Sequence, residues 1–428
     1  MGRVNRRDAH PTGADEAGDR AGRSRTDAAG PGGGPDRAVP ARPPGAPVAR
    51  GRGAAVVLDL LRGAGADGIS RLELAERAGL TPQAVSKITA RLRAEGLARE
   101  AGRRASTGGK PRTVLRLVPD AAHAVGVHLD RDELRAVLVD LAGATVAAHR
   151  TPLDFAAGPE AAVEAAAAAT EHLLRERARP DSPAPAVAAV TAPAVHRPAA
   201  GPRGPLGVGV ALPGPLDHRT GVLHRVTGHP EWDGFPLRDT LARRLGGTPV
   251  VVDKDTNAAA LGPALRRAAG ESFAYLHLGT GLGAGLVLGG AVYRGSRTGA
   301  GEFGHQVVQL DGPVCGCGQR GCVEALCLAA VERGDVAGAA RVLGIGAANL
   351  VSLLDIDLVL LGGRTVAADE TAFVDGVAAV LGERARREGG PAVPVRAAGG
   401  GVRGVAEGAA QAVLAPLFGR TDRADGAG

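Results

Sequence analysis

Residues 301–305 read Gly-Glu-Phe-Gly-His, and residues 315–324 read Cys-Gly-Cys-Gly-Gln-Arg-Gly-Cys-Val-Glu. One imidazole and three thiolates at this spacing can close a tetrahedron around zinc, while the glycines let the chain wrap the ion. The predicted ligands are His305, Cys315, Cys317 and Cys322. No coordination position would remain open, so we expect a structural Zn²⁺ site, the alternative being a chance cluster of free thiols.

The four cysteines of the chain all lie within residues 315–327. Such close spacing cannot form a disulfide framework for a long chain, and in a reducing compartment it indicates metal binding. Cys327 follows the predicted ligands on a predicted helical segment, and we expect it to be a small buried residue and not a ligand.

The region around these motifs, residues 121 to 419, has the pattern of an α/β protein, because short apolar runs alternate with alanine-rich stretches. Predicted strands cover residues 124–127, 136–140, 206–211, 249–252, 273–278, 283–288 and 358–361, and predicted helices cover residues 159–177 and 256–269. A hairpin-like pair recurs in both halves, which predicts two similar lobes with a ligand cleft between them.

Residues 53–117 predict short helices followed by a hairpin. Ser70 and Glu73 have the spacing of a capping box, which opens a helix expected to bury Leu72, Ala75 and Ala78. A second helix begins with Thr81 as N-cap and Pro82 in the first turn. Its apolar positions, at helical spacing, are Val85, Ile88 and Leu92.

The outer face of this second helix is short, polar and basic, and the following hairpin carries a Gly-Gly-Lys turn flanked by arginines. This layout predicts a winged helix-turn-helix, with a recognition helix for base edges and a wing for the DNA backbone or minor groove. The predicted DNA contacts are Thr81, Gln83, Ser86, Lys87, Arg91, Arg103, Arg104, Lys110 and Arg112. A basic face in any small helical domain of an arginine-rich protein is the alternative.

Charge and composition divide the 428 residues further. The whole chain carries a formal charge of +6, and residues 81–120 alone carry about +6, which suits a phosphate-contacting module on a near-neutral body. Residues 1–50 contain almost no large apolar side chain, so burial cannot offset the entropy of ordering them. The predicted organisation is a disordered tail (1–50), a winged helix-turn-helix domain (51–118), an α/β domain (119–419) with a flexible insertion (179–205), and a disordered tail (420–428).

Several of these motifs together closely resemble the signature of the ROK family, which includes bacterial repressors and sugar kinases. The resemblance covers most of residues 53 to 419, and its elements are residues 212–216, 232–237, 253–257, 279–285, 301–305, 315–324 and 361–363. It implies a two-lobed sugar kinase fold of the actin-like ATPase kind, with a sugar held between the lobes. The predicted winged helix places the chain with the repressor branch, which includes xylose and N-acetylglucosamine repressors.

The family pattern also implies roles for individual residues. Asp255 would be the general base of a kinase, and Glu302, His305 and Glu324 would contact other sugar hydroxyls. Lys254 stands where family members usually have Asn, and it introduces a cation that could pair with Asp255. The expected ligand-binding residues are therefore Lys254, Asp255, Glu302, His305 and Glu324. Alternatively, Glu302 and Glu324 only support the zinc site.

Kinases of this family begin with Asp-x-Gly-x-Thr, a turn whose backbone N–H groups receive phosphate. Residues 128–134 instead read His-Leu-Asp-Arg-Asp-Glu-Leu, without glycine and with three carboxylates that would repel a triphosphate. We therefore expect no kinase activity, and Asp255 would be a vestigial base. The second glycine-rich segment, residues 279–285, could bind a phosphate or could be a plain strand turn.

The sequence thus predicts a DNA-binding transcriptional regulator, most simply a repressor of carbohydrate genes. Its zinc-containing domain would sense a sugar or sugar phosphate and mediate assembly into a homodimer or homotetramer on operator DNA. The chain shows no signal peptide and no uncharged apolar run of 18 residues, so we expect a cytoplasmic, nucleoid-associated protein without membrane contact. The alternatives are an ATP-dependent hexose kinase with an appended DNA-binding domain, and a dimerisation scaffold that binds no ligand.

Overall fold

The computed structural model describes residues 51–106, 109–178, 204–224, 226, 229–267 and 270–420. The predictions made for residues 1–50, 179–203 and 421–428 lie outside these residues.

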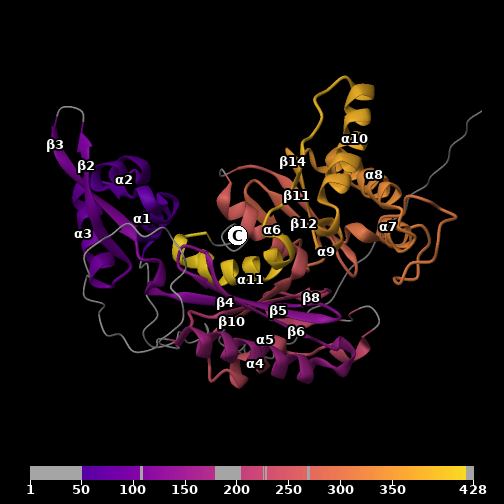
Figure 1. Cartoon of the computed structure of the whole chain (residues 1–428), viewed down its shortest axis with the longest axis horizontal. Coiled ribbons are helices and arrows are strands. Elements are labelled where there is room, and N and C mark those ends of the chain that lie inside the picture. The colour runs from indigo at the N-terminus through magenta and orange to yellow at the C-terminus, as the bar shows by residue number, and fades with distance from the viewer. Residues whose placement is uncertain are drawn as a thin grey trace, which may run out of the picture. The chain divides into compact units, whose positions relative to one another are not determined.

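Residues 51–117, here called the N-terminal module, form three helices and a three-stranded antiparallel sheet of order β1-β3-β2 (Figure 1). The helices are α1 (Arg52–Gly63), α2 (Arg71–Ala78) and α3 (Pro82–Ala94), and the strands are β1 (Ile69–Ser70), β2 (Ala98–Ser106) and β3 (Gly109–Leu117). The strands β2 and β3 form the predicted hairpin.

Both predicted helix starts are present in the N-terminal module. The Ser70 hydroxyl accepts from the Glu73 N–H at 3.3 Å, and the Glu73 carboxylate accepts from the Ser70 N–H at 2.8 Å. One predicted core position is wrong: Leu72 is 42% exposed, and Leu74 is buried in its place beside Ala75. The buried face of α2 is therefore centred on Leu74 and Ala75, and the predicted face, which included Leu72, is rotated about the helix axis relative to it.

The first lobe is built on a five-stranded sheet of order β10-β7-β4-β5-β6. Its strands are β4 (His123–Leu129), β5 (Glu133–Asp140), β6 (Thr145–Pro152), β7 (Val208–Leu212) and β10 (Val250–Lys254). Alternate side chains of β4 face opposite ways. Val125 and Val127 pack with α4 (Pro159–Ala178) and α5 (Leu237–Arg244), whereas Ala124 packs with α11 (Gly404–Leu414).

The second lobe repeats this arrangement with the order β13-β12-β11-β14-β15. Its strands are β11 (Phe273–Leu278), β12 (Leu282–Leu288), β13 (Ala291–Tyr293), β14 (Leu358–Gly362) and β15 (Val395–Ala397). One face packs against α7 (Val323–Glu332), α8 (Val336–Leu354) and α10 (Glu370–Glu388), and the other faces α6 (Asp255–Arg266). In both lobes three antiparallel strands are followed by two parallel ones, as the prediction of two similar lobes requires.

The helix α11 lies very close to the first sheet, and two glycines make this possible. A Cβ at Gly126 or at Gly209 would lie 1.9 Å from a backbone carbonyl oxygen of α11, that of Ala406 or Ala409 respectively. No side chain fits in that space. The sheet and helix backbones are therefore in direct contact.

A continuous core joins the N-terminal module to the first lobe. One buried cluster contains Leu58 of α1, Leu115 of β3, Val137 of β5 and Leu414 of α11. At its edge the Arg62 guanidinium lies 4.0 Å from the centre of the Phe418 ring. The N-terminal module and the first lobe thus share one buried apolar core.

Among the described residues, α8 alone is long and apolar enough to cross a membrane by length and composition. This is weak evidence, because α8 packs with α7 and α10 as a core helix does.

Candidate metal centre and ligand site

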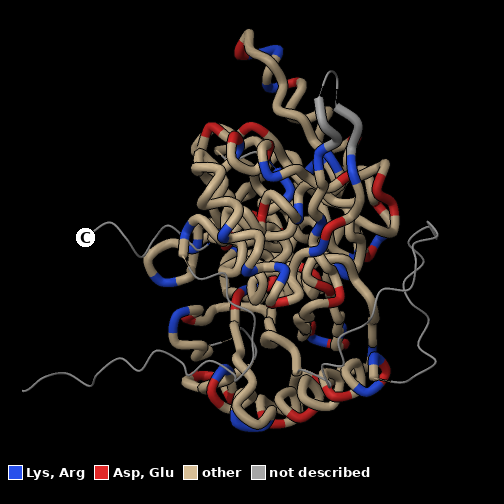
Figure 2. Tube along the Cα trace, turned by 90° about the vertical axis from the view of Figure 1, so that its left-hand side faces the viewer, with Lys and Arg blue, Asp and Glu red and all other residues tan. Residues whose placement is uncertain are grey.

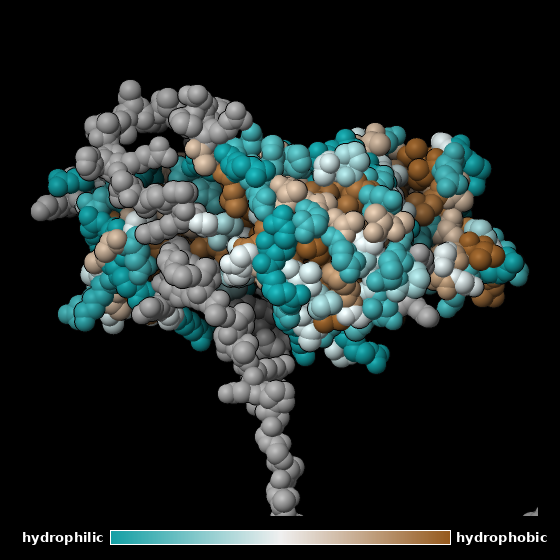
Figure 3. Space-filling view, turned by 90° about the horizontal axis from the view of Figure 1, so that it is seen from below, coloured by the Kyte–Doolittle hydropathy of each residue, from teal (hydrophilic) through white to brown (hydrophobic). Residues whose placement is uncertain are grey.

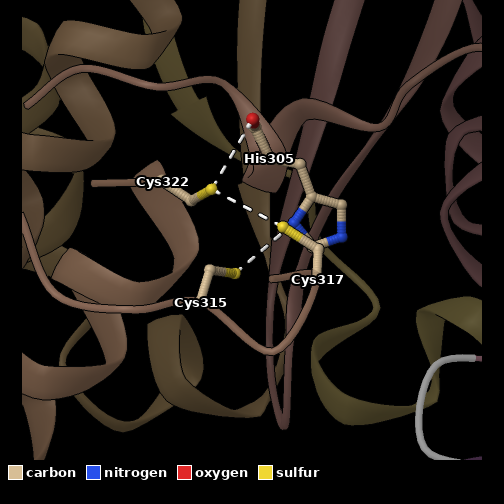
Figure 4. A group of neighbouring side chains, drawn as sticks. All are labelled: His305, Cys315, Cys317 and Cys322. Atoms are coloured by element: carbon tan, nitrogen blue, oxygen red, sulfur yellow. Dashed lines mark hydrogen bonds between the residues drawn. The ribbon is translucent and has the colours of Figure 1, made fainter. Parts of the chain in front are cut away.

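The four predicted zinc ligands lie together in space (Figure 4). The ligand atoms of His305, Cys315, Cys317 and Cys322 all lie within 4.8 Å of one another. The Cys317 and Cys322 sulfurs are 3.8 Å apart, and the Cys315 sulfur is 3.7 Å from His305 Nδ1.

These distances fit a tetrahedral zinc ion. With zinc–sulfur bonds of about 2.3 Å, the edges of a tetrahedron of thiolates are about 3.8 Å long. Because Nδ1 of His305 faces the sulfurs, Nε2 is left for another partner. The donor set and its spacing therefore suit a metal ion whose four positions are all taken by protein.

Local backbone geometry brings the cysteines together. A tight turn is closed by a 2.7 Å hydrogen bond from the Cys315 N–H to the Gln319 carbonyl. Gly321 has a φ of 69°, and a Cβ there would lie 1.5 Å from the Gln309 carbonyl oxygen. Cys322 then caps α7, which anchors the end of the loop in the second lobe.

The loop that carries the cluster has little core of its own. Leu310 and Val314 are 84% and 61% exposed, although both are large apolar residues. In Figure 3, brown apolar patches lie between teal ones at the end of the molecule that holds α7 and α8. A loop with so few buried apolar contacts depends on other interactions to hold its conformation.

The thiols of the cluster differ in their environments. Burial raises the pKa of Cys322 to about 12 and also raises the pKa of Cys315, whereas the backbone N–H of Gln319 lowers the pKa of Cys317. A cation at the centre would favour all three thiolates, because thiols bind zinc in the deprotonated form. Cys327 lies outside the cluster, buried on α7, and donates to the Ala339 carbonyl at 3.5 Å.

Lys254 ends β10 and reaches from the first lobe to the second. Its side chain is 5% exposed, and its ammonium donates to the Glu302 carboxylate at 2.5 Å and to the Ala300 carbonyl at 3.1 Å. Glu302 is 52% exposed. The ion pair of Lys254 is therefore with Glu302, while Asp255 interacts with it only through longer-range attraction.

Asp255 and Glu324 lie at the ends of helices next to this pair. Asp255 begins α6, and burial raises the pKa of its carboxyl group. Both oxygens of Glu324 have protein partners, since one accepts from the Leu282 N–H at 2.8 Å and the other lies 3.7 Å from the Cys315 sulfur. Glu324 thus also suits the alternative role of supporting the metal loop.

The acidic turn and the glycine-rich segment meet across the lobes. The turn between β4 and β5 carries Asp130, whose carboxylate accepts from the Thr280 hydroxyl at 2.7 Å. Gly285, by contrast, lies inside β12, where a Cβ would be 2.1 Å from the Thr256 carbonyl oxygen of α6. Helix packing therefore explains this glycine without a phosphate.

Two partners in this region are not predictable from the sequence. Arg364 begins α9 (Arg364–Ala368) and forms hydrogen bonds of 2.8 and 3.0 Å with the two oxygens of Asp132. Arg294 forms a 2.7 Å ion pair with Asp253, and both are nearly fully buried. These partners are 232 and 41 residues apart, so no local pattern could have paired them.

The predicted DNA contacts on α3 share one exposed surface of the N-terminal module. Thr81 caps α3 by accepting from the Ala84 N–H at 3.2 Å, while Val85 and Leu92 are buried on the opposite side. The residues Gln83, Ser86 and Lys87 are exposed, and Arg91 is half-buried beside Glu95.

The predicted DNA contacts on the hairpin are described in part. Arg103 and Arg112 are exposed there, and blue segments in Figure 2 lie beside the grey tip of the hairpin. The side chains of Arg104 and Lys110 lie outside the described part.

The fold and the site together define a class: a two-lobed α/β protein in which a His/Cys₃ cluster lies beside residues that link the two lobes. The ROK family model matches residues 125–334. A ROK hexokinase from Thermus thermophilus is 31% identical, with a TM-score of 0.51, and the match covers 69% of this chain and 98% of that one. The chain therefore belongs to the ROK family.

Two further relatives extend the comparison. The xylose repressor of Bacillus subtilis is 28% identical over 258 residues, which is 60% of this chain and 61% of the repressor, so less than two thirds of that protein is matched. A ROK family transcriptional regulator, a homolog of the Escherichia coli MLC protein, is 21% identical with a TM-score of 0.61. That match covers 85% of this chain and 96% of the regulator, and it shows a shared fold.

Proposed function

We propose that this protein is a DNA-binding transcriptional repressor of carbohydrate genes. The observation that carries the proposal is the N-terminal module, in which α2, a short turn and α3 precede a basic hairpin on a ROK body. In this proposal residues 51–118 are a winged helix-turn-helix domain, and α3 enters the major groove. The name of the Bacillus subtilis relative, a xylose repressor, supports it.

The ROK body, residues 119–419, is proposed to sense a sugar or sugar phosphate through Lys254, Asp255, Glu302, His305 and Glu324. It would hold a structural Zn²⁺ at the His/Cys₃ cluster and assemble as a homodimer or homotetramer, which sets the spacing of the paired DNA-binding modules. As a DNA-binding protein it would act in the cytoplasm, at the nucleoid. The missing glycine in residues 128–134 supports a body that no longer transfers phosphate.

Selection of bound duplexes from a random DNA pool tests the central claim. Wild-type protein should enrich one sequence, and Lys87→Ala should weaken binding to it by about 1–3 kcal/mol if Lys87 contacts a base. The matched control is Arg175→Ala, which removes an exposed positive charge from α4 of the body. Failure to enrich any sequence, with folded protein and metal bound, would refute the repressor proposal.

An ATP-dependent hexose kinase is the second candidate. Asp255, which the family pattern makes the general base, lies at the start of α6, and the Thermus thermophilus relative is a hexokinase. A coupled ADP-release assay over a panel of hexoses distinguishes the two. We expect no turnover above background. Turnover that Asp255→Asn abolishes would establish the kinase instead.

A further inference from the structure

We propose that two carboxylates of the β4–β5 turn form an intrachain catch that holds the two lobes together through direct side-chain bonds. Asp130 and Asp132 belong to the first lobe, whereas their partners, Thr280 and Arg364, belong to the second. The sequence separations are 150 and 232 residues, so each bond joins segments that lie far apart along the chain and belong to different lobes.

The two bonds differ in environment and therefore in strength. Asp130 is 7% exposed, and its carboxylate accepts from both the Thr280 hydroxyl and the Arg131 N–H. A hydrogen bond to a charged acceptor is stronger than one between neutral groups, and this bond is shielded from water, so it contributes more to holding the lobes together. The Arg364–Asp132 pair is more exposed and contributes less.

The position of the catch gives it a regulatory role. It lies on the same pair of lobes that Lys254 and Glu302 bridge, so a ligand that enters between the lobes must work against both connections. The catch thereby sets how often the ligand site opens in the free protein. This role does not depend on the identity of the ligand or on DNA binding.

Amide hydrogen exchange on the full-length protein tests the catch. In Asp130→Ala, the amides of residues 279–282 in the opposite lobe should exchange about tenfold faster, as expected for the loss of one charge-assisted hydrogen bond. The reciprocal variant Thr280→Val should accelerate exchange at residues 130–133. The matched control is Asp154→Ala, which removes a carboxylate of the first lobe whose bond among the described residues is local, to the Ala156 N–H.

Acceleration confined to the mutated turn itself, or equal acceleration in the control, would overturn the proposal. If Asp130→Ala fails to fold, the variant Asp132→Ala removes only the more exposed connection, the Arg364–Asp132 pair. It should accelerate the amides of residues 363–366 by a smaller factor, and unchanged exchange there would equally overturn the proposal.

Discussion

Cys317 is the exposed sulfur of the His/Cys₃ cluster, and its replacement isolates the contribution of metal binding. The Cys317→Ser variant should release the metal and lower the free energy of unfolding by about 2–4 kcal/mol, because the surrounding loop has few buried apolar contacts. Elemental analysis of purified protein and thermal unfolding measure the two effects. The control variant Cys327→Ala should retain full metal content. If elemental analysis found no zinc in the purified wild-type protein, the assignment of a zinc site to this cluster would be contradicted.

His128 is a buried imidazole on β4, and burial lowers its pKa to about 4 from the ordinary value of 6.5. Between pH 6.5 and pH 4 the unfolded chain binds a proton that the folded protein excludes. This group therefore makes stability fall as the pH falls, by at most about 1.4 kcal/mol per pH unit. Denaturant unfolding of His128→Leu across this range should show a shallower pH dependence than the wild type. Parallel curves would show that His128 does not titrate as described.

At the scale of elements, the β2–β3 hairpin and α3 should contact DNA phosphates through their basic residues. Replacing Arg103, Arg104 and Lys110 by Ala should weaken binding to all DNA sequences and reduce the salt dependence, by up to about 0.9 in log–log slope for each phosphate that is no longer neutralised. Fluorescence anisotropy at several salt concentrations gives the slope. Arg175→Ala on α4 serves as the control, and an unchanged slope in the triple variant would exclude the hairpin from the interface.

The close packing of α11 on the first sheet gives a second prediction at this scale. Gly126→Ala places a methyl group 1.9 Å from the Ala406 carbonyl oxygen, so the helix must move away. The expected loss is about 1–3 kcal/mol or more of unfolding free energy, measured by chemical denaturation. Gly63→Ala is the matched control, since no atom of the part of the chain that the structure describes lies within 4 Å of a Cβ there. If both variants were equally stable, the described contact between backbones would be wrong.

Element boundaries also show how far sequence reasoning reaches. The predicted strands fall on β4, β5, β7, β10, β11, β12 and β14, because each is an apolar run between turn residues. The strand β6 escapes prediction because it lies at the sheet edge, with half-exposed and polar residues. The prediction for Leu72 is wrong because α2 has only eight residues, and its apolar residues fit more than one helical face. The sequence pattern therefore does not decide between Leu72 and Leu74 as the buried residue.

For the whole molecule, the shared core between the N-terminal module and the first lobe predicts a common unfolding transition. Trp232, the single tryptophan, is buried in the first lobe and reports that lobe by fluorescence, while DNA binding reports the module. Both signals should be lost at one temperature. In Phe418→Ala the transition temperatures of both signals should fall together, because the substitution should lower the free energy of unfolding by about 3–5 kcal/mol.

The control for this variant is Leu353→Ala, because Leu353 is 78% exposed on α8 and should change stability by less than about 0.5 kcal/mol. Loss of DNA binding well before the fluorescence change in the wild type would mean that the module unfolds independently.

The candidate site is predictable to the extent that its residues are close in sequence. The metal ligands lie within residues 305–322, so spacing and residue type are enough. The pairs Lys254–Glu302 and Arg364–Asp132 depend on how two lobes close on each other, which local patterns do not encode. Sequence alone therefore locates the groups but not their partners.

The matching strand orders of the two lobes have one more consequence. The β4–β5 turn and the β11–β12 turn occupy equivalent positions in a pseudo-symmetric pair of units, since each joins the first two antiparallel strands of its sheet. Asp130 and Thr280 thus stand on equivalent turns of the two lobes. The equivalent turns of the two lobes therefore bond to each other, and the turn of the first lobe supplies the acceptor while that of the second supplies the donor.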